Sequence, residues 1–195
     1  MALLRHGYGR QARAWSPRSE VLGAIAIASY VIHAAVHLSR GEPQDLLWMC
    51  HIASLLVGFG LLCRWPNANV IGFLWSCVGT PLWILDLATG GEFFPTAILT
   101  HGSGVVIGFI GVQRLGLPRG AAFKAVAAFV PLWALTRAVT PPSANVNVAF
   151  SVYEGWQTWF SSYPPYFVML LGFGLLMFIV AERMLALISR TKRTV

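Results

Sequence analysis

Charged residues are scarce in this sequence, and so are the motifs of common soluble enzymes. Only 11% of the 195 residues are Asp, Glu, Lys or Arg, whereas soluble domains carry about a quarter. The three cysteines have no CxxC spacing, so they indicate neither a disulfide framework nor a zinc ribbon. The absence of G-x-S-x-G and H-E-x-x-H motifs argues against ordinary serine hydrolases and zincin proteases.

Long apolar runs take the place of these features. Hydrophobic residues make up 56% of the chain, and the mean hydropathy is +0.65. A membrane-spanning helix needs about 20 mainly apolar residues. Six segments approach that length, at residues 20–39, 44–63, 68–88, 94–115, 121–138 and 164–188. The breaks between them contain Gly, Pro or charged residues, which often end helices. The sequence therefore predicts an all-α, polytopic membrane protein with a six-transmembrane-helix bundle.

The net charge of +7 suggests nucleic acid as a partner, but the positions of the basic residues argue against it. Twelve of the 14 Lys and Arg residues fall on one side of the predicted bundle, and only Arg40 and Arg137 fall on the other. The twelve are Arg5, Arg10, Arg13 and Arg18 at the N-terminus, Arg64 in the second loop, Arg114, Arg119 and Lys124 around the fourth loop, and Arg183, Arg190, Lys192 and Arg193 at the C-terminal end. Basic loops stay in the cytoplasm, so both termini are expected to be cytoplasmic.

Three parts of the chain follow from this layout. We expect a basic cytoplasmic N-terminal segment at 1–19, a transmembrane domain at 20–189 with an outer aromatic loop at 139–163, and a basic cytoplasmic tail at 190–195. The N-terminal segment lacks a compact apolar core followed by a small-residue cleavage site. We therefore predict that it is retained and is not a signal peptide.

Several ionisable side chains fall at one depth, near the outer leaflet. They are His33, His37, His51, His101 and Asp86. Ionisable groups at membrane depth are costly and usually face the interior of a bundle, so a shared level indicates a functional site.

His33 and His37 are four residues apart and share a helix face. They are candidate ligands of a metal ion or a haem, although a histidine at the interface also commonly bonds to a neighbouring carbonyl group. His101 is followed by the small residues 102–104, which let another helix approach closely. A structural hydrogen bond is the alternative role for this histidine.

Cys50 indicates a different chemistry. A thiolate near a histidine forms acyl-thioester intermediates, and the histidine acts first as base and then as acid. His51 adjoins Cys50, but neighbours on a helix point about 100° apart, so His101 is the predicted partner. Asp86 or another histidine would orient the imidazole. The expected substrate is a phospholipid at headgroup level.

The outer loop is too aromatic for a disordered connector. We expect it to lie on the membrane interface as a lid or a short helix. The candidate substrate-binding residues are His51, Asn145, Asn147, Trp156 and Gln157.

Three stretches resemble a known family. "LLWMCHIASLL", then "LTHGSGVVIGF", then "SANVNVAF…WF…YPPYFVMLLGFGLL" are similar to the YwaF-like integral membrane proteins of bacteria. Animal relatives of that family are membrane acyltransferases that remodel ether phospholipids with a Cys/His pair. The resemblance covers about residues 44 to 188 and implies the same six-span layout in the bacterial cytoplasmic (inner) membrane.

Carried over residue by residue, the resemblance implies a nucleophile at Cys50 and a catalytic histidine at His101. The sequence departs from the family at position 51, where His51 replaces the Asp expected in bacterial members. The pair His33 and His37 matches no family feature, so metal binding is a second departure to consider.

Three functions stay open on the sequence alone. The first is a Cys/His acyltransferase or lipid hydrolase acting on phospholipid or fatty-acyl esters, with no cofactor expected. The second is a haem- or transition-metal-binding protein that uses His33, His37, His51 and His101. The third is a structural subunit of a larger membrane complex with the aromatic loop as docking surface. A homo-oligomer is a further expectation, and nucleic acid is not expected as a partner.

Overall fold

The computed structural model describes residues 17–153 and 155–191, and all regular structure in these residues is helical. The expected all-α fold is therefore confirmed. The long helices are α1 (Pro17–Ser39), α2 (Met49–Leu62), α3 (Pro66–Ala88), α6 (Ala121–Val139) and α7 (Tyr163–Thr191). Between α3 and α6, the helix α4 (Ala97–Gly102), the π-helical turn η2 (Ser103–Ile107) and the helix α5 (Gly108–Leu115) follow one another without a break.

Five helical segments are long and apolar enough to cross a membrane, at residues 17–39, 66–88, 97–115, 121–139 and 163–188. The apolar helix α2 has 14 residues, about 21 Å, which is less than the hydrocarbon core of about 30 Å. The chain thus has the build of a multi-pass helical membrane protein.

The start of α2 differs from the predicted second segment, 44–63. Residues 44–47 belong to a short 3-10 helix, η1 (Pro43–Leu47), and the α-helix begins only at Met49. The first amides of a helix have no partner inside it. Here the Met49 N–H donates to Oδ1 of Asn147 at 2.8 Å, so a residue from far along the chain caps α2.

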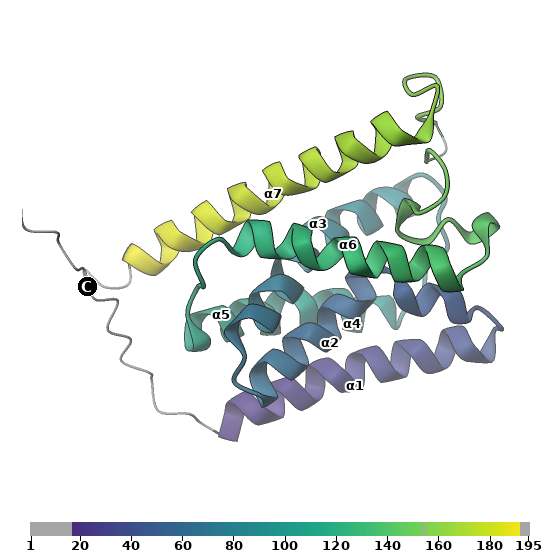
Figure 1. The fold of residues 1–195 in the computed structure, drawn as a ribbon. Helices are drawn as coiled ribbons and strands as arrows, with labels where there is room; N and C mark the ends of the chain where they lie inside the picture. The colour runs from purple at the N-terminus through teal and green to yellow at the C-terminus, as the bar shows by residue number, and fades with distance from the viewer. Residues whose placement is uncertain (1–16, 154, 192–195) are drawn as a thin grey trace, which may run out of the picture.

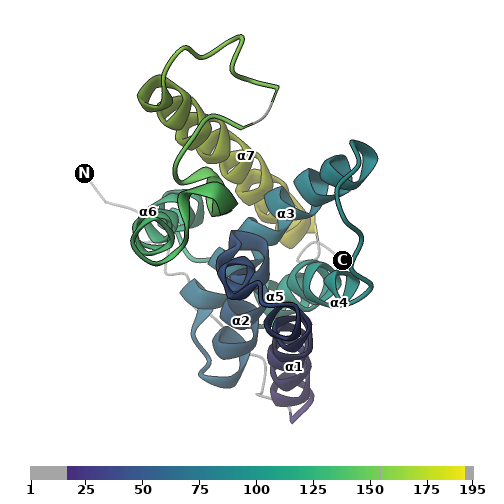
Figure 2. The ribbon, with the colours of Figure 1, turned by 90° about the vertical axis from the view of Figure 1, so that its right-hand side faces the viewer.

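When the continuous run of α4, η2 and α5 is taken as one helical rod, successive rods run in alternating directions, and the first turn of α1 and the last turn of α7 lie at the same end of the bundle (Figure 1). Helix α2 packs against both α1 and α3. Helix α7 packs on α6 and α3 and lies on the opposite side of the bundle from α1 (Figures 1 and 2).

Glycines allow the helices to touch backbone to backbone. A Cβ at Gly72 of α3 would collide with the carbonyl oxygen of Ala53 in α2. The close approach predicted for residues 102–104 occurs at Gly104, where a Cβ would collide with Oγ of Ser76 in α3. Gly102 instead has no heavy atom within 4 Å of the position of a Cβ. These contacts fix α2, α3 and η2 relative to one another.

The predicted outer loop, 139–163, is folded in its described part. It contains two 3-10 helices, η3 (Pro142–Ala144) and η4 (Val146–Val148). The hydroxyl of Tyr163 donates to the Val148 carbonyl at 2.8 Å, and Nε1 of Trp133 donates to the same hydroxyl at 3.0 Å. Of the basic segments predicted at 1–19 and 190–195, residues 1–16 and 192–195 lie outside the described residues.

Candidate metal centre

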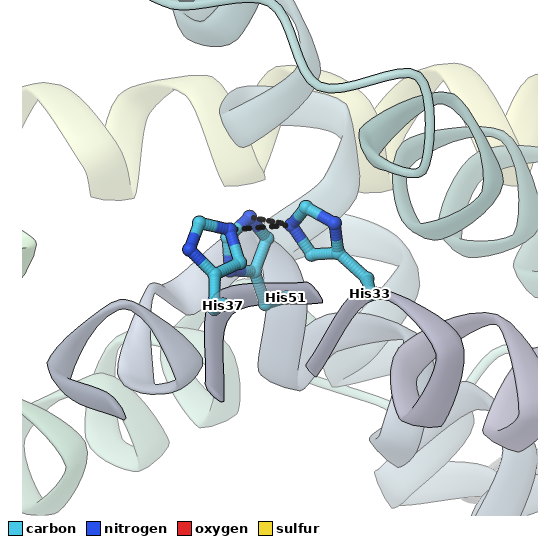
Figure 3. A group of neighbouring side chains, drawn as sticks. All are labelled: His33, His37 and His51. Atoms are coloured by element: carbon cyan, nitrogen blue, oxygen red, sulfur yellow. Dashed lines mark hydrogen bonds between the residues drawn. The ribbon is translucent and has the colours of Figure 1, made fainter. Parts of the chain in front are cut away.

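Three buried histidines meet between α1 and α2. His33 and His37 lie one helical turn apart on α1, as predicted, and His51 comes from the first turn of α2. Nε2 of His33 lies 3.1 Å from Nε2 of His51 and 3.3 Å from Nε2 of His37 (Figure 3). Three imidazoles thus direct the same ring nitrogen toward one point, and we call them the three-histidine centre.

The other ring nitrogen of each histidine is held by a partner outside the centre. Nδ1 of His51 donates to the backbone carbonyl of Asp45 at 2.8 Å. Nδ1 of His37 lies 3.2 Å from Oε2 of Glu42 and 3.6 Å from Oδ2 of Asp45. Nδ1 of His33 lies 2.7 Å from Oγ1 of Thr96. Metal-ligating histidines are oriented by such bonds, which fix the tautomer and the ring plane.

These partners determine where the ring hydrogens sit. A neutral imidazole carries one ring hydrogen, and a carbonyl or an ionised carboxylate only accepts. In their neutral forms, His51 and His37 would therefore carry their hydrogens on Nδ1 and present lone pairs at Nε2. Nε2 of His33 has at most one hydrogen for two neighbours. At least one of the two contacts then places two nitrogen lone pairs against each other. A cation bound between the nitrogens would accept both lone pairs.

The spacing of the nitrogens fits a metal ion. A tetrahedral zinc ion with bonds of about 2.0–2.1 Å to imidazole nitrogens separates its ligand atoms by about 3.3 Å. Two of the three separations between the nitrogens are 3.1 and 3.3 Å, and all three ligand atoms lie within 4.8 Å of one another. A haem would have to insert a flat macrocycle among rings that are already in hydrogen-bond contact. The geometry therefore favours a bare ion over a haem.

Cys50 and His101 form a second group beside this centre. The sulfur of Cys50 and one ring nitrogen each of His51 and His101 lie within 4.8 Å of one another. The structure thus brings the two predicted catalytic residues together from α2 and α4. His101 is buried, its ring stacks on Trp83 at 4.4 Å, and its Nδ1 lies 3.2 Å from Oγ1 of Thr80.

Nε2 of His101 is buried and has no hydrogen-bond partner among the described residues. A buried polar atom without a partner is unfavourable, and in native proteins it often marks an ion or water site or a catalytic role. Thr80 takes the orienting position for which the sequence suggested Asp86. Oδ1 of Asp86 instead accepts from the hydroxyl of Tyr153 at 3.2 Å.

The two asparagines predicted to bind substrate hold the loop together. Oδ1 of Asn145 accepts from the amides of Phe150 and Ser151 at 2.9 and 3.1 Å. The buried Asn147 caps α2 through Met49, and its Nδ2 donates to the carbonyl of Leu47 at 2.7 Å and to Oγ1 of Thr136 at 3.0 Å. Asn147 therefore joins the loop, α2 and α6.

Trp156 and Gln157, the other two predicted substrate-binding residues, are exposed. The ring of Trp156 lies 6.4 Å from that of Phe160 and 6.5 Å from that of Tyr166. Trp156 and Gln157 both lie on the aromatic loop between α6 and α7.

Sequence reasoning missed the residues around the histidines. Glu42 and Asp45 follow His37 by five and eight residues, in the loop "RGEPQD". Two carboxylates this close in sequence to a histidine could have been predicted to contact its ring. Burial raises the pKa of the Asp45 carboxyl, opposed by a hydrogen bond from Trp48. Thr96 and Thr80 come from distant segments and left no signal in the sequence.

Comparison of the chain with protein-family models, curated proteins and solved structures finds no match. The resemblance to the YwaF-like proteins stays a prediction, and the site has to be interpreted from its own geometry.

Proposed function

We propose that this chain is a multi-pass membrane protein that binds a zinc-class transition-metal ion at His33, His37 and His51. The observation that carries the proposal is the convergence of three buried Nε2 atoms whose rings are held from behind through Nδ1. Three nitrogen ligands leave one tetrahedral position open, as in catalytic zinc sites. That position is available to water, to a substrate or to a further side chain.

The membrane arrangement that we propose has six spans and cytoplasmic termini. Among the described residues, the helix ends opposite the histidines carry Arg18, Arg64, Arg114, Arg119, Lys124 and Arg183. The end with the histidines carries Arg40 and Arg137. By the positive-inside rule, the metal centre would face the outer side of the bacterial inner membrane, with α2 as a short sixth span.

Metal analysis of the purified full-length protein tests the proposal. The protein should be produced with an affinity tag free of histidine, and its metal content measured by mass spectrometry. We expect a stoichiometric transition metal in the wild-type chain and its loss in His33→Ala, because His33 contacts both other ligands. Cys63→Ala is the control and should retain the metal, because Cys63 is exposed and belongs to none of the groups of ligand residues. A wild-type protein that stays metal-free after zinc is supplied would overturn the proposal.

A second candidate function rests on the proximity of Cys50 and His101. In this proposal the Cys50 sulfur attacks the ester carbonyl of a phospholipid. His101 takes the thiol proton and returns it to the departing lipid alcohol, and the acyl group then passes from sulfur to an acceptor. An acyl adduct on Cys50 in the intact mass spectrum would support it.

Activity measurements separate this second candidate from metal binding. Cys50→Ala and His101→Ala should each abolish acyl transfer, while Cys63→Ala and Cys77→Ala should not. Full activity in Cys50→Ala would rule out the thioester route. The roles of a homo-oligomer or of a larger membrane complex stay predictions.

A further inference from the structure

The three-histidine centre is the middle of three overlapping groups of ligand atoms. An outer group consists of His37, Glu42 and Asp45, and an inner group consists of Cys50, His51 and His101. The ligand atoms within each group lie within 4.8 Å of one another. His37 belongs to both the outer group and the centre, and His51 belongs to both the centre and the inner group. The groups therefore form a continuous series.

Exposure falls from the carboxylates of the outer group to the buried histidines, while Cys50 of the inner group is half-buried. The side chains of Glu42 and Asp45 are 30% and 24% exposed, whereas His33 is 1% and His101 is 2% exposed. The carboxylates of the outer group follow α1, with Asp45 in η1, and the inner group lies between α2 and α4. An ion arriving from water meets the carboxylates before it meets the buried imidazoles.

The unpartnered Nε2 of His101 is a separate observation that points to a ligand in the inner group. Trp83 stacks on the ring and Thr80 occupies Nδ1, so Nε2 is the nitrogen left to bind. Metal-ligating histidines are typically held in this way, with a bond at the opposite nitrogen. Cys50 adds a thiolate, which zinc-class ions bind well.

We infer that these groups form a ligand-exchange path, by which a divalent zinc-class ion enters at Glu42 and Asp45, binds the three-histidine centre and reaches an inner position at Cys50, His51 and His101. This inference rests on the proposed function of the three-histidine centre. It names that centre's substrate as the metal ion itself.

Each step exchanges ligands without any change of oxidation state. In the outer step, the ion leaves the carboxylates and Nδ1 of His37 and binds Nε2 of all three histidines, while the ring hydrogen of His37 moves from Nε2 to Nδ1. In the inner step, it keeps His51, leaves His33 and His37, and gains His101 and the Cys50 sulfur. The thiol proton passes to a histidine nitrogen that the ion has left, so protons and charge balance.

Arg40 is the positive charge at the entrance. Its Nη1 lies 2.8 Å from Oε1 of Glu92, and its Nε lies 3.3 Å from Oε2 of Glu42. An entering cation would replace Arg40 at Glu42, while the pair with Glu92 keeps Arg40 in place. A divalent ion can therefore take the Glu42 carboxylate from Arg40, and the Arg40 guanidinium is still paired with Glu92.

Cobalt(II) is a suitable probe for both steps, because cobalt–thiolate bonds give a charge-transfer band in the near ultraviolet. The experiment follows Co²⁺ binding to the metal-free full-length protein in nanodiscs by stopped-flow absorbance. We expect the thiolate band in the wild-type chain and its loss in Cys50→Ser, with metal still bound by the histidines. Cys63→Ser and Cys77→Ser are matched controls and should keep the band.

The entrance is tested by rate. Electrostatic steering raises association rates by about tenfold or more, so Glu42→Gln with Asp45→Asn should slow Co²⁺ binding about tenfold. Higher ionic strength should slow wild-type binding as well, because salt screens the carboxylates. The salt dependence is measured on the wild-type chain, so it tests the entrance even if the double variant does not fold.

The outcomes separate the inference from the function on which it rests. If the wild-type chain binds no Co²⁺, or if His33→Ala binds as well as the wild type, the proposed centre itself is wrong. If binding is stoichiometric and depends on His33 but no thiolate band appears, the inner position is wrong. If the rate is unchanged both in the carboxylate variant and at high salt, the entrance is wrong.

Discussion

His33 connects the three-histidine centre, because its Nε2 contacts the Nε2 of both His37 and His51. The i, i+4 spacing on α1 placed His33 and His37 on one face in advance. The third ring is that of His51, the residue after Cys50. Neighbouring residues on a helix point about 100° apart, so the sequence did not predict His51 as the partner of the Cys50 thiol. In the structure, the ring of His51 points toward α1 and contacts His33.

Asn147 gives a prediction at the residue scale. It is buried, makes three hydrogen bonds to three other segments and has a φ of 52°. Asn147→Ala leaves buried partners unsatisfied and places alanine in a left-handed conformation, so we expect a loss of about 2–4 kcal/mol in unfolding free energy. Thermal unfolding in detergent, followed by tryptophan fluorescence, measures the effect.

The exposed Gln157 is the matched control for this experiment, and Gln157→Ala should unfold like the wild type. An Asn147→Ala protein that is as stable as the wild type but has lost its activity would instead support the substrate-binding role predicted from the sequence.

At the scale of single elements, the apolar pattern predicted most of the helices closely. The break residues in the loops marked where α3, α6 and α7 begin, because Pro, Gly and charge interrupt apolar runs. The start of α2 was missed, since a side chain 98 residues away caps it. The π-helical turn at Ser103–Ile107 was also missed, because its extra residue per turn leaves no simple trace in an apolar run.

Gly72 gives a prediction at this scale. A Cβ there would collide with backbone atoms of Ala53 and lie 2.9 Å from the amide nitrogen of Val57. Backbone cannot shift aside as a side chain can, so Gly72→Ala should force α2 and α3 apart and cost about 1–3 kcal/mol. Because α2 carries Cys50 and His51, metal retention should fall together with the unfolding temperature.

Gly172 and Gly174 of α7 supply the contrast, since neither has a heavy atom within 4 Å of the position of a Cβ. Gly172→Ala or Gly174→Ala should be neutral or raise stability by up to about 1 kcal/mol, from helix propensity alone. Equal destabilisation by Gly72→Ala and Gly172→Ala would contradict the described packing of α2 against α3.

At the scale of the whole molecule, the asymmetry of basic residues leads to a proposed topology with six spans. The alternation of the helical rods agrees with it, although α2 is short. The gathering of the histidines at one end of the bundle could be predicted, because the distribution of basic residues gives the direction of each span. The partners Thr80, Thr96 and Asn147 could not, because contacts between distant helices depend on rotation and register that hydropathy does not encode.

Labelling of single cysteines tests the topology. In a variant without the three native cysteines, Gln157→Cys should react with a membrane-impermeant maleimide in intact cells. Arg119→Cys, at an exposed position between α5 and α6, and Asn67→Cys should react only after permeabilisation. If α2 does not cross the membrane, Asn67→Cys will react from the outside.

X-ray absorption at the zinc edge of the purified full-length protein tests the three-histidine centre most directly. We expect stoichiometric zinc with a first shell dominated by imidazole nitrogens at about 2.0–2.1 Å, and loss of that signal in His33→Ala. A first shell made only of oxygen, or the same spectrum in His33→Ala, would contradict it.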